Sequence, residues 1–305
     1  MEKLKWKMVV NMFIYINEKI IKKEEASISP FDHGFLYGLG LFETLRIYDG
    51  HPFLLVDHLK RLNHGLDVLN IKYQFELEKT IKILQELLVK NNLTNAYIRI
   101  NISAGEGDIG LQMSPYTEPN IFIFLKPLEP IMEIVEKKAV LLKLRRNTPE
   151  GDERLKSHHF LNNVLAKREI GDLSINHEGI FLTESGYVAE GIVSNVFWKK
   201  GNVLYTSALS TGILNGITRQ FIIELARKKG LCVQEGLYKV DQILESEELF
   251  VTNSTQEIVP ILSFEEKKFP GKKGELVQML YQEYRTYCKS LWTRNDLNVD
   301  NPLWN

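Results

Sequence analysis

The first half of the chain contains short segments in which apolar and polar residues alternate, the period expected of strands with one buried face. Polar turns connect two pairs of these segments, and the Asp49-Gly50 pair within the second connection strongly favours a hairpin. The pattern predicts strands at residues 12–16, 19–22, 42–48, 51–55, 97–103, 121–125 and 139–144.

Two longer segments of the same half have apolar residues at spacings of three and four, which gather on one face of a helix. The first is expected to start at Asp57, whose side chain would cap it, and to bury Leu59, Leu62 and Leu66. The second covers about residues 76–90. Together with the strands, these helices predict an N-terminal α/β domain.

The second half begins with a loop, RRNTPEGDE, and continues with strands and helices in mixed order. Because they do not alternate strictly, the sequence predicts an α+β class. The expected strands lie at residues 179–183, 187–189, 194–198, 203–205 and 249–252, and the expected helices at 159–171, 217–229 and 276–291.

Pro127 and Pro130 mark a linker, because proline interrupts both helices and central strands. The two Met residues near the first strand suggest that the working chain starts close to Met12. The predicted division is an N-terminal domain over residues 12–128, a C-terminal domain over 129–291, and flexible tails at 1–11 and 292–305.

Composition and charge narrow the class of protein. Of the 305 residues, 44% are hydrophobic and 25% charged, so the chain can bury a sizeable core. The 38 Lys and Arg residues nearly balance the 39 Asp and Glu residues, which is atypical of a dedicated nucleic-acid binder. No apolar run approaches the roughly 20 residues needed to cross a bilayer, and the two cysteines do not indicate a disulfide scaffold. We therefore expect a cytoplasmic protein. The charge balance does not exclude small anionic substrates, because the charge of a pocket is set locally.

The histidines and glycines do not form a familiar site. His158 and His159 are adjacent and therefore point in different directions, and His58 and His64 lie on different faces of their helix. We expect His58 and His64 to be solvated, and we expect no metal site. No glycine-rich stretch has the spacing of a dinucleotide-binding loop or a P-loop.

Two turns in the second half are suited to bind an anion. Segment 215–218 begins a helix, where free backbone amides and a threonine hydroxyl favour phosphate. Segment 252–255 is a hydroxyl-rich turn after a buried strand. Each alone is more often an ordinary cap or turn. Arg61 is a possible third contact for the anion. Asp57 lies four residues earlier on the same helix, so a surface ion pair between these two residues is an equal alternative.

Lys156 is a possible catalytic residue. It follows a loop and stands at the threshold of a helix. Most lysines are simply solvated, so a catalytic one needs a desolvated pocket that lowers its pKa and allows imine formation.

Several stretches together resemble the class IV pyridoxal-phosphate aminotransferase family, in the family's order and over nearly the whole chain. Within it, RNTPEGDERLKSHHFLNNVLAKREIG, DHGFLYG and NISAG are most similar to the bacterial 4-amino-4-deoxychorismate lyases. The stretches that carry the family resemblance are SPFDHGFLYGLGLFETLRIYDG, HLKRL, RLKSHHFLNNVLAKREI, YVAEGIVSNVFWKKGNVLYT, NGITRQFIIELA and ELFVTNSTQEIVPI.

This resemblance implies a two-domain fold with pyridoxal 5'-phosphate in the cleft between the domains, usually in a homodimer. Lys156 matches the lysine that binds the cofactor as a Schiff base. Glu190 matches the carboxylate that pairs with the pyridine nitrogen. The phosphate contacts implied in the same way are Arg61, Ile217, Thr218, Ser254 and Asn253.

Departures from other members favour a lyase that converts 4-amino-4-deoxychorismate to 4-aminobenzoate and pyruvate, a step of folate synthesis. The loop AGEGDIGLQ lacks the arginine and histidine of D-amino-acid transaminases, and Leu161 replaces a tyrosine of branched-chain transaminases. An aminotransferase acting on D-amino acids or branched-chain amino acids is the alternative. Residues proposed for the substrate pocket are Tyr37, Phe42, Arg99, Thr211 and Gly212.

Overall fold

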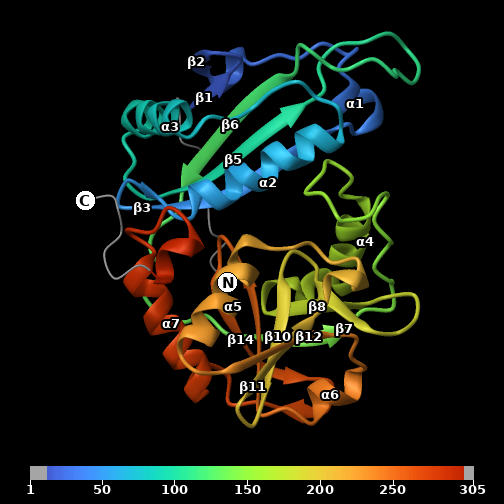
Figure 1. Ribbon diagram of the computed structural model, residues 1–305, viewed down its shortest axis with the longest axis vertical. Coiled ribbons are helices and arrows are strands. Elements are labelled where there is room, and N and C mark those ends of the chain that lie inside the picture. Colours follow the sequence, from blue (N-terminus) through green and yellow to red (C-terminus); the bar gives the residue numbers. More distant parts are fainter. Residues whose placement is uncertain (1–11, 299–305) are drawn as a thin grey trace.

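The computed structural model describes residues 12–298; the expectations for residues 1–11 and 299–305 lie outside the described residues. The described chain has a two-domain α+β architecture built on two β-sheets, the upper one in Figure 1 from the N-terminal half and the lower one from the C-terminal half. The chain passes from the first sheet to the second between Pro127, where β6 ends, and Lys137, where β7 begins. The crossing segment contains Pro130.

The first sheet has six strands in the order β2-β1-β6-β5-β3-β4, and each neighbouring pair is antiparallel. Along β5, Ile98, Ile100 and Ile102 face the core on every second residue. The intervening side chains, including Arg99, therefore face the opposite side of the sheet. The strands are β1 (Phe13–Ile16), β2 (Lys19–Lys22), β3 (Gly40–Tyr48), β4 (His51–Pro52), β5 (Ala96–Ser103) and β6 (Asn120–Pro127).

The second sheet is mixed, with the order β12-β11-β10-β13-β14-β7-β8-β9 and β15 paired to β14. Its strands β7, β8 and β14 run parallel to one another, whereas β10, β11, β13 and β14 form antiparallel neighbours. The strands are β7 (Lys137–Leu141), β8 (His177–Leu182), β9 (Val188–Gly191), β10 (Asn195–Lys200), β11 (Val203–Ser207), β12 (Cys232–Gly236), β13 (Glu248–Asn253), β14 (Glu257–Phe264) and β15 (Lys267–Lys268).

Helices cover both sheets, and α5 and α7 pack together in the lower half of Figure 1. Phe53, which follows β4, inserts between them, with ring centroids 5.3 Å from Phe221 and 5.1 Å from Tyr284. This aromatic contact joins the two halves of the chain in one core. The α-helices are α1 (His33–Tyr37), α2 (Leu55–Val68), α3 (Leu77–Asn91), α4 (Leu161–Ile170), α5 (Ile217–Lys228), α6 (Val240–Leu244) and α7 (Glu275–Tyr287). The 3-10 helices are η1 (Lys23–Glu25), η2 (Gly171–Ile175), η3 (Leu209–Thr211), η4 (Gly271–Lys273) and η5 (Arg294–Asn298).

The strands expected from alternation are present, with ends shifted by a few residues. The first hairpin is confirmed by the pairing of Ile14 with Ile21. Strands β12, β14 and β15 and the short helices α1 and α6 were not expected. In β12, CVQEG is polar and half exposed, so it has little hydrophobic pattern of its own. It is a strand because it pairs with β11 in parallel register.

The C-terminal segment contradicts two expectations, the cap of α2 by Asp57 and the flexible tail. Asp57 does not cap α2; the N-cap position is Leu54, and the amides of Leu54 and Val56 donate to the carbonyl groups of Leu291 and Trp292 at 3.1 and 3.0 Å. A flexible tail from residue 292 is therefore wrong for residues 292–298. Trp292 packs against the hydrophobic core of the N-terminal half. Leu297, the last hydrophobic residue of the segment, is 1% exposed.

The helices are short compared with the thickness of a bilayer, and α3 has 15 residues. Within residues 12–298, none of the helices combines the length and the hydropathy that crossing a bilayer requires.

Candidate active site

A cavity of about 340 Å³ lies between the two sheets. Strands β3 and β5 and helix α2 contribute to its wall from the first half of the chain, and β9, β10, β13 and α5 from the second half. The structure brings together all seven residues matched to cofactor contacts, and two of the five proposed for the substrate also line this cavity. Those lining residues are Lys156, Arg61, Glu190, Ile217, Thr218, Asn253, Ser254, Phe42 and Arg99.

Lys156 projects into this cavity from the segment before α4. Its carbonyl oxygen accepts a hydrogen bond from the Phe42 amide at 2.9 Å, which fixes the backbone beside β3. Its ammonium group lies 4.4 Å from the centroid of the Phe42 ring. Desolvation first, and then the positive charges of Arg61 and Arg99, lower the pKa of Lys156 to about 8, although Glu43 acts in the opposite direction. A much larger fraction of this amine is therefore neutral and nucleophilic near pH 7 than for a solvated lysine.

Glu190, at the end of β9, is 4% exposed and its carboxylate has donors on both oxygens. One oxygen accepts from Nε of Arg146 at 2.8 Å, and Nε of Arg154 lies 3.9 Å from the same oxygen. The other oxygen accepts from the amide of Leu214 at 3.0 Å and from Asn195 at 3.4 Å. The two guanidinium groups compensate the buried negative charge, and the donors fix the plane of the carboxylate.

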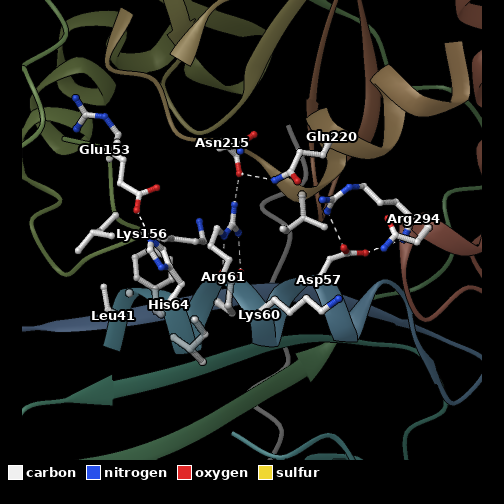
Figure 2. Close-up of a pocket in the computed structure, with 18 residues that line it drawn as sticks. Leu41, Asp57, Lys60, Arg61, His64, Glu153, Lys156, Asn215, Gln220 and Arg294 are labelled. Atoms are coloured by element: carbon white, nitrogen blue, oxygen red, sulfur yellow. Dashed lines mark hydrogen bonds and ion pairs between the residues drawn. The ribbon is translucent and has the colours of Figure 1, made fainter. Parts of the chain in front are cut away.

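Arg61 extends from α2 across the gap between the two halves, as Figure 2 shows, and its Nη1 donates to the carbonyl of Asn215 at 2.7 Å. Its Nε and Nη2 donate to the two carboxylate oxygens of Glu43 at 2.7 and 2.8 Å. The alternative ion pair with Asp57 does not form, because Asp57 binds Arg294 instead. Arg61 thus lines the cavity and is held by Glu43 of β3, a partner that the sequence did not predict.

Glu43 is fully buried and also accepts a hydrogen bond from Nδ1 of His58 at 2.7 Å. Burial alone would raise the pKa of Glu43, but the charge of Arg61 and the interaction with His58 outweigh it and hold the pKa well below its usual range. His58 is 2% exposed, so the expectation that it is solvated is wrong. His58 faces β3, and only the docking of α2 onto the sheet decides that this side of the helix is buried.

The two turns that the sequence predicts to suit an anion meet at the cavity. Helix α5 begins at Ile217, directly after Gly216, so its first free amides lie at the cavity wall. The hydroxyl oxygen of Thr218 is 3.3 Å from that of Ser254 on the other turn. Twelve residues of α5 give this terminus a helix dipole that favours a negative group.

Asn253 lines the cavity and also orders the turn that follows it. Its side-chain oxygen accepts hydrogen bonds from the amides of Thr255 at 3.0 Å and Gln256 at 2.7 Å. Asn253 therefore shapes the turn that presents Ser254. Thr255, the last residue of the hydroxyl-rich segment 252–255, also lines the cavity.

The proposed substrate residues divide into two groups. Arg99 lies with its guanidinium carbon 3.6 Å from the centroid of the Phe42 ring, and both residues line the cavity. Tyr37, Thr211 and Gly212 do not belong to the lining of this cavity in the described chain. Their positions instead serve neighbouring loops, because Tyr37 accepts from the amide of Gly110 and the Gly212 carbonyl accepts from Arg154.

Five residues that build the site were missed by sequence reasoning: Arg146, Arg154, Glu43, His58 and Asn195. Arg146 and Arg154 stand in a charged loop, and nothing local distinguishes them from solvated arginines. A carboxylate in a largely apolar strand, GLFETLRIY, was the available signal for Glu43, because a charged residue is rarely buried unless it is paired.

A second cavity of about 270 Å³ adjoins the first and is the one drawn in Figure 2. Arg61 and Lys156 belong to the walls of both cavities. Their side chains therefore help to separate the two spaces.

Comparison with known proteins identifies the family of this chain. The model of the family described as amino-transferase class IV matches residues 40–264, which include every residue of the first cavity. The chain belongs to the amino-transferase class IV family. This class IV chain is 46% identical over 280 residues to the aminodeoxychorismate lyase of Bacillus subtilis (strain 168), covering 91% of this chain and 95% of that protein.

Two further relatives carry other activities in their names. A putative branched-chain-amino-acid aminotransferase of Methanocaldococcus jannaschii is 35% identical over 276 residues, covering 90% of this class IV chain and 96% of the relative. The crystal structure of a T.th. branched-chain amino acid aminotransferase with pyridoxamine 5'-phosphate superposes with a TM-score of 0.81 at 26% identity, covering 90% of this chain and 93% of that chain. These relatives therefore share the family of this chain but are named for different activities.

Proposed function

We propose that the cavity between the two sheets binds pyridoxal 5'-phosphate. The observation that carries this proposal is that a lysine of lowered pKa, a buried carboxylate and a phosphate-suited helix terminus line one space. Gly216 allows the close packing that forms this terminus, because a Cβ atom there would lie 2.1 Å from the side-chain oxygen of Asn195 and would crowd the first turn of α5. A class IV relative is named as a complex with pyridoxamine 5'-phosphate, a group with the same phosphate and ring.

Each residue of the site has a defined part in holding this cofactor. The hydroxyl groups of Thr218 and Ser254, the amides at the start of α5 and Arg61 would hold the phosphate. Glu190 would keep a proton on the ring nitrogen, and Lys156 would form the covalent link. Bound pyridoxal phosphate supplies a ring that accepts the electron pair of the bond broken in the substrate.

We propose further that the reaction is the conversion of 4-amino-4-deoxychorismate to 4-aminobenzoate and pyruvate. The 46% identity to an aminodeoxychorismate lyase over nearly the full chain supports it. So does the loop after β5, where residues 104–112 contain neither arginine nor histidine to grip an amino-acid carboxylate. Arg99 faces the cavity from β5 and is a suitable partner for one of the two substrate carboxylates.

Lys156 is the proposed base of this reaction. Its amine would take the proton from the ring carbon that bears the substrate amino group, and the carbon–oxygen bond at the neighbouring carbon would break. The leaving enolpyruvate gains a proton and becomes pyruvate, while the remaining ring becomes aromatic. A pKa near 8 suits a group that must accept a proton and return it near neutral pH.

The deciding experiment supplies the substrate enzymatically. Purified chain and pyridoxal phosphate are incubated with chorismate, glutamine and an aminodeoxychorismate synthase, and 4-aminobenzoate is measured by chromatography. We expect product at a rate proportional to the amount of this chain, and none above background with Lys156→Ala. Absence of product from the unaltered chain, although it binds the cofactor, would reject the lyase reaction and leave the cofactor proposal standing.

Aminotransfer to D-amino acids or branched-chain amino acids is the second candidate, supported by the 35% identity to a putative branched-chain aminotransferase. Half-reactions separate the two activities. An aminotransferase converts the bound cofactor to its pyridoxamine form when given an amino donor alone. The absorbance change with D-alanine or L-leucine would be fast for an aminotransferase and slow for a lyase.

We also propose that the protein acts in the cytoplasm as a homodimer. Helix α4, beside the cavity, leaves Leu161 68% exposed, and Val193 on the cavity wall is 53% exposed. Apolar residues gathered beside a site are typical of a surface that another chain covers. Light scattering after size-exclusion chromatography tests the oligomeric state; a monomeric mass at micromolar concentration would contradict it.

A further inference from the structure

The turn that presents Ser254 is tied to the opposite sheet by one arginine. Arg46 lies on β3 and is 1% exposed. Its Nη1 donates to the carbonyl of Thr255 at 3.0 Å, and its Nη2 donates to the carbonyl of Glu129 in the crossing segment. A single guanidinium group from the first sheet therefore binds both the turn between β13 and β14 and the chain that connects the two sheets.

A buried carboxylate completes the junction. Glu257, the first residue of β14, is fully buried and accepts at one oxygen from Arg46 at 3.3 Å, Tyr48 at 2.9 Å and Arg285 at 2.9 Å. Its backbone has a φ of 62°, in the left-handed region that non-glycine residues rarely adopt. This conformation persists because the surrounding contacts hold it in place.

The junction is not optimised as a purely structural ion pair. The second oxygen of Glu257 and Nε of Arg46 are buried and have no hydrogen-bond partner among the described residues. Leaving such groups unpaired costs stability, whereas an apolar packing of the same volume would not incur that cost. The guanidinium of Arg46 instead directs its donors to the backbone of the turn and of the crossing segment.

We infer that Arg46 is a positioning residue for the phosphate end of the cofactor site, an inference that rests on the proposed pyridoxal phosphate. Arg46 itself does not line the cavity. It fixes the carbonyl of Thr255, and thereby sets where Ser254 stands relative to Thr218 on α5. Phosphate binding then requires the first sheet to be docked correctly against the second.

The test separates phosphate recognition from general stability by comparing two ligands. The full-length protein is stripped of cofactor, and dissociation constants are measured for pyridoxal 5'-phosphate and for pyridoxal, which has the same ring without the phosphate. For Arg46→Lys we expect the affinity for pyridoxal 5'-phosphate to fall about tenfold, the loss of roughly one hydrogen bond to a charged group, and the affinity for pyridoxal to change by less than about twofold.

Arg285→Met is the matched control, because Arg285 binds the same carboxylate of Glu257 from α7 and lies outside the turn that presents Ser254. Its ratio of the two affinities should match that of the unaltered protein. Equal losses for both ligands in Arg46→Lys, or an unchanged ratio, would overturn the inference. Arg46→Met is the stronger variant and should widen the ratio further; Arg46→Lys keeps the charge beside Glu257 and decides the question if Arg46→Met does not fold.

The result is independent of which reaction the site catalyses, because it is read from binding alone. Failure of the unaltered protein to bind pyridoxal phosphate would instead reject the proposed cofactor. If the unaltered protein binds the cofactor normally and Arg46→Lys has the same affinity ratio, only the positioning role is rejected.

Discussion

Arg294 and Asp57 are 237 residues apart in the chain, yet the carboxylate of Asp57 accepts hydrogen bonds from both the backbone amide and the guanidinium group of Arg294, at 2.7 and 2.6 Å. The amide and the side chain of one residue thus fasten the C-terminal segment onto the first turn of α2. Helix α2 also carries Arg61 into the cavity. The C-terminal segment therefore supports the helix that supplies Arg61, the arginine proposed to bind the phosphate.

Removing the charged partner of Asp57 should destabilise the protein. Asp57 is 3% exposed, so Arg294→Met leaves a buried carboxylate with one donor fewer, and we expect the free energy of unfolding to fall by about 1–3 kcal/mol. Urea denaturation followed by circular dichroism measures it. Lys289→Met is the control, because its ion pair with Asp49 is exposed and screened by solvent and should contribute little to stability. Equal effects of the two variants would contradict the prediction.

The lowered pKa of Lys156 should be visible in the pH dependence of its reactivity. Its neutral fraction rises around pH 8 instead of around the ordinary value of 10.5. We expect the rate of cofactor capture by the stripped protein to increase with pH up to a midpoint near 8. Because the unfolded lysine binds a proton up to about pH 10.5, stability of the stripped protein should also rise between about pH 8 and 10.5.

Lys156→Met provides the control for both measurements. It should abolish covalent capture and remove that part of the rise in stability. Capture with a midpoint near the ordinary lysine value of 10.5 would show that the cavity does not perturb this amine.

Glu43 should contribute stability that is lost in acid. Since its pKa is lower in the folded state than its ordinary value of 4.5, the contribution is complete above about pH 4.5 and declines as the pH falls below it. Glu43→Gln should lower the free energy of unfolding near neutral pH and flatten its decline below pH 4.5. Glu245→Gln is the control, because that carboxylate forms an exposed pair with Lys200. The role of Glu43 is refuted if the free energy of unfolding has the same pH dependence in Glu43→Gln and in the unaltered protein, from neutral pH to below 4.5.

Adding one methyl group at Gly216 should damage the phosphate end of the site. The new Cβ would collide with the side chain of Asn195, whose amide also contacts Glu190. For Gly216→Ala we expect a fall of about tenfold or more in affinity for pyridoxal phosphate and a loss of about 1–3 kcal/mol in stability. Gly151→Ala should change stability by less than about 0.5 kcal/mol, because a Cβ there meets open space. Fluorescence titration measures the affinities, and equal behaviour of the two variants would disprove the steric explanation.

Arg99 should affect the substrate and spare the cofactor. It reaches the cavity from the face of β5 opposite the core, and a guanidinium group there can bind a carboxylate. For Arg99→Met we expect kcat/KM with aminodeoxychorismate to fall about tenfold or more, mainly through KM, with unchanged affinity for pyridoxal phosphate. Arg145→Met, an exposed arginine outside the cavity wall, should leave both quantities unchanged. A loss of cofactor affinity in Arg99→Met would assign Arg99 to the cofactor instead.

Sequence reasoning was strongest where the physical signal is local. Alternation along β1 and β2 and the Asp49-Gly50 turn predicted hairpins, because a few neighbouring residues decide which face is buried and which turn can form. The terminus of α5 was predicted for the same reason, since free amides and a threonine hydroxyl at a helix start are properties of adjacent residues. Resemblance to a family then connected these local features with Lys156 and Glu190.

Only the tertiary structure decided the partners of the charged residues. The same helix, α2, offers Asp57, His58 and Arg61, and local spacing allowed a pair between Asp57 and Arg61 without deciding for it. Docking onto β3 buries His58 and turns Arg61 toward Glu43, while the C-terminal segment supplies Arg294 to Asp57. These choices depend on which surfaces meet when the sheets, helices and C-terminal segment pack together. A charge selects the partner that burial brings within hydrogen-bonding distance, and distance along the chain does not carry that information.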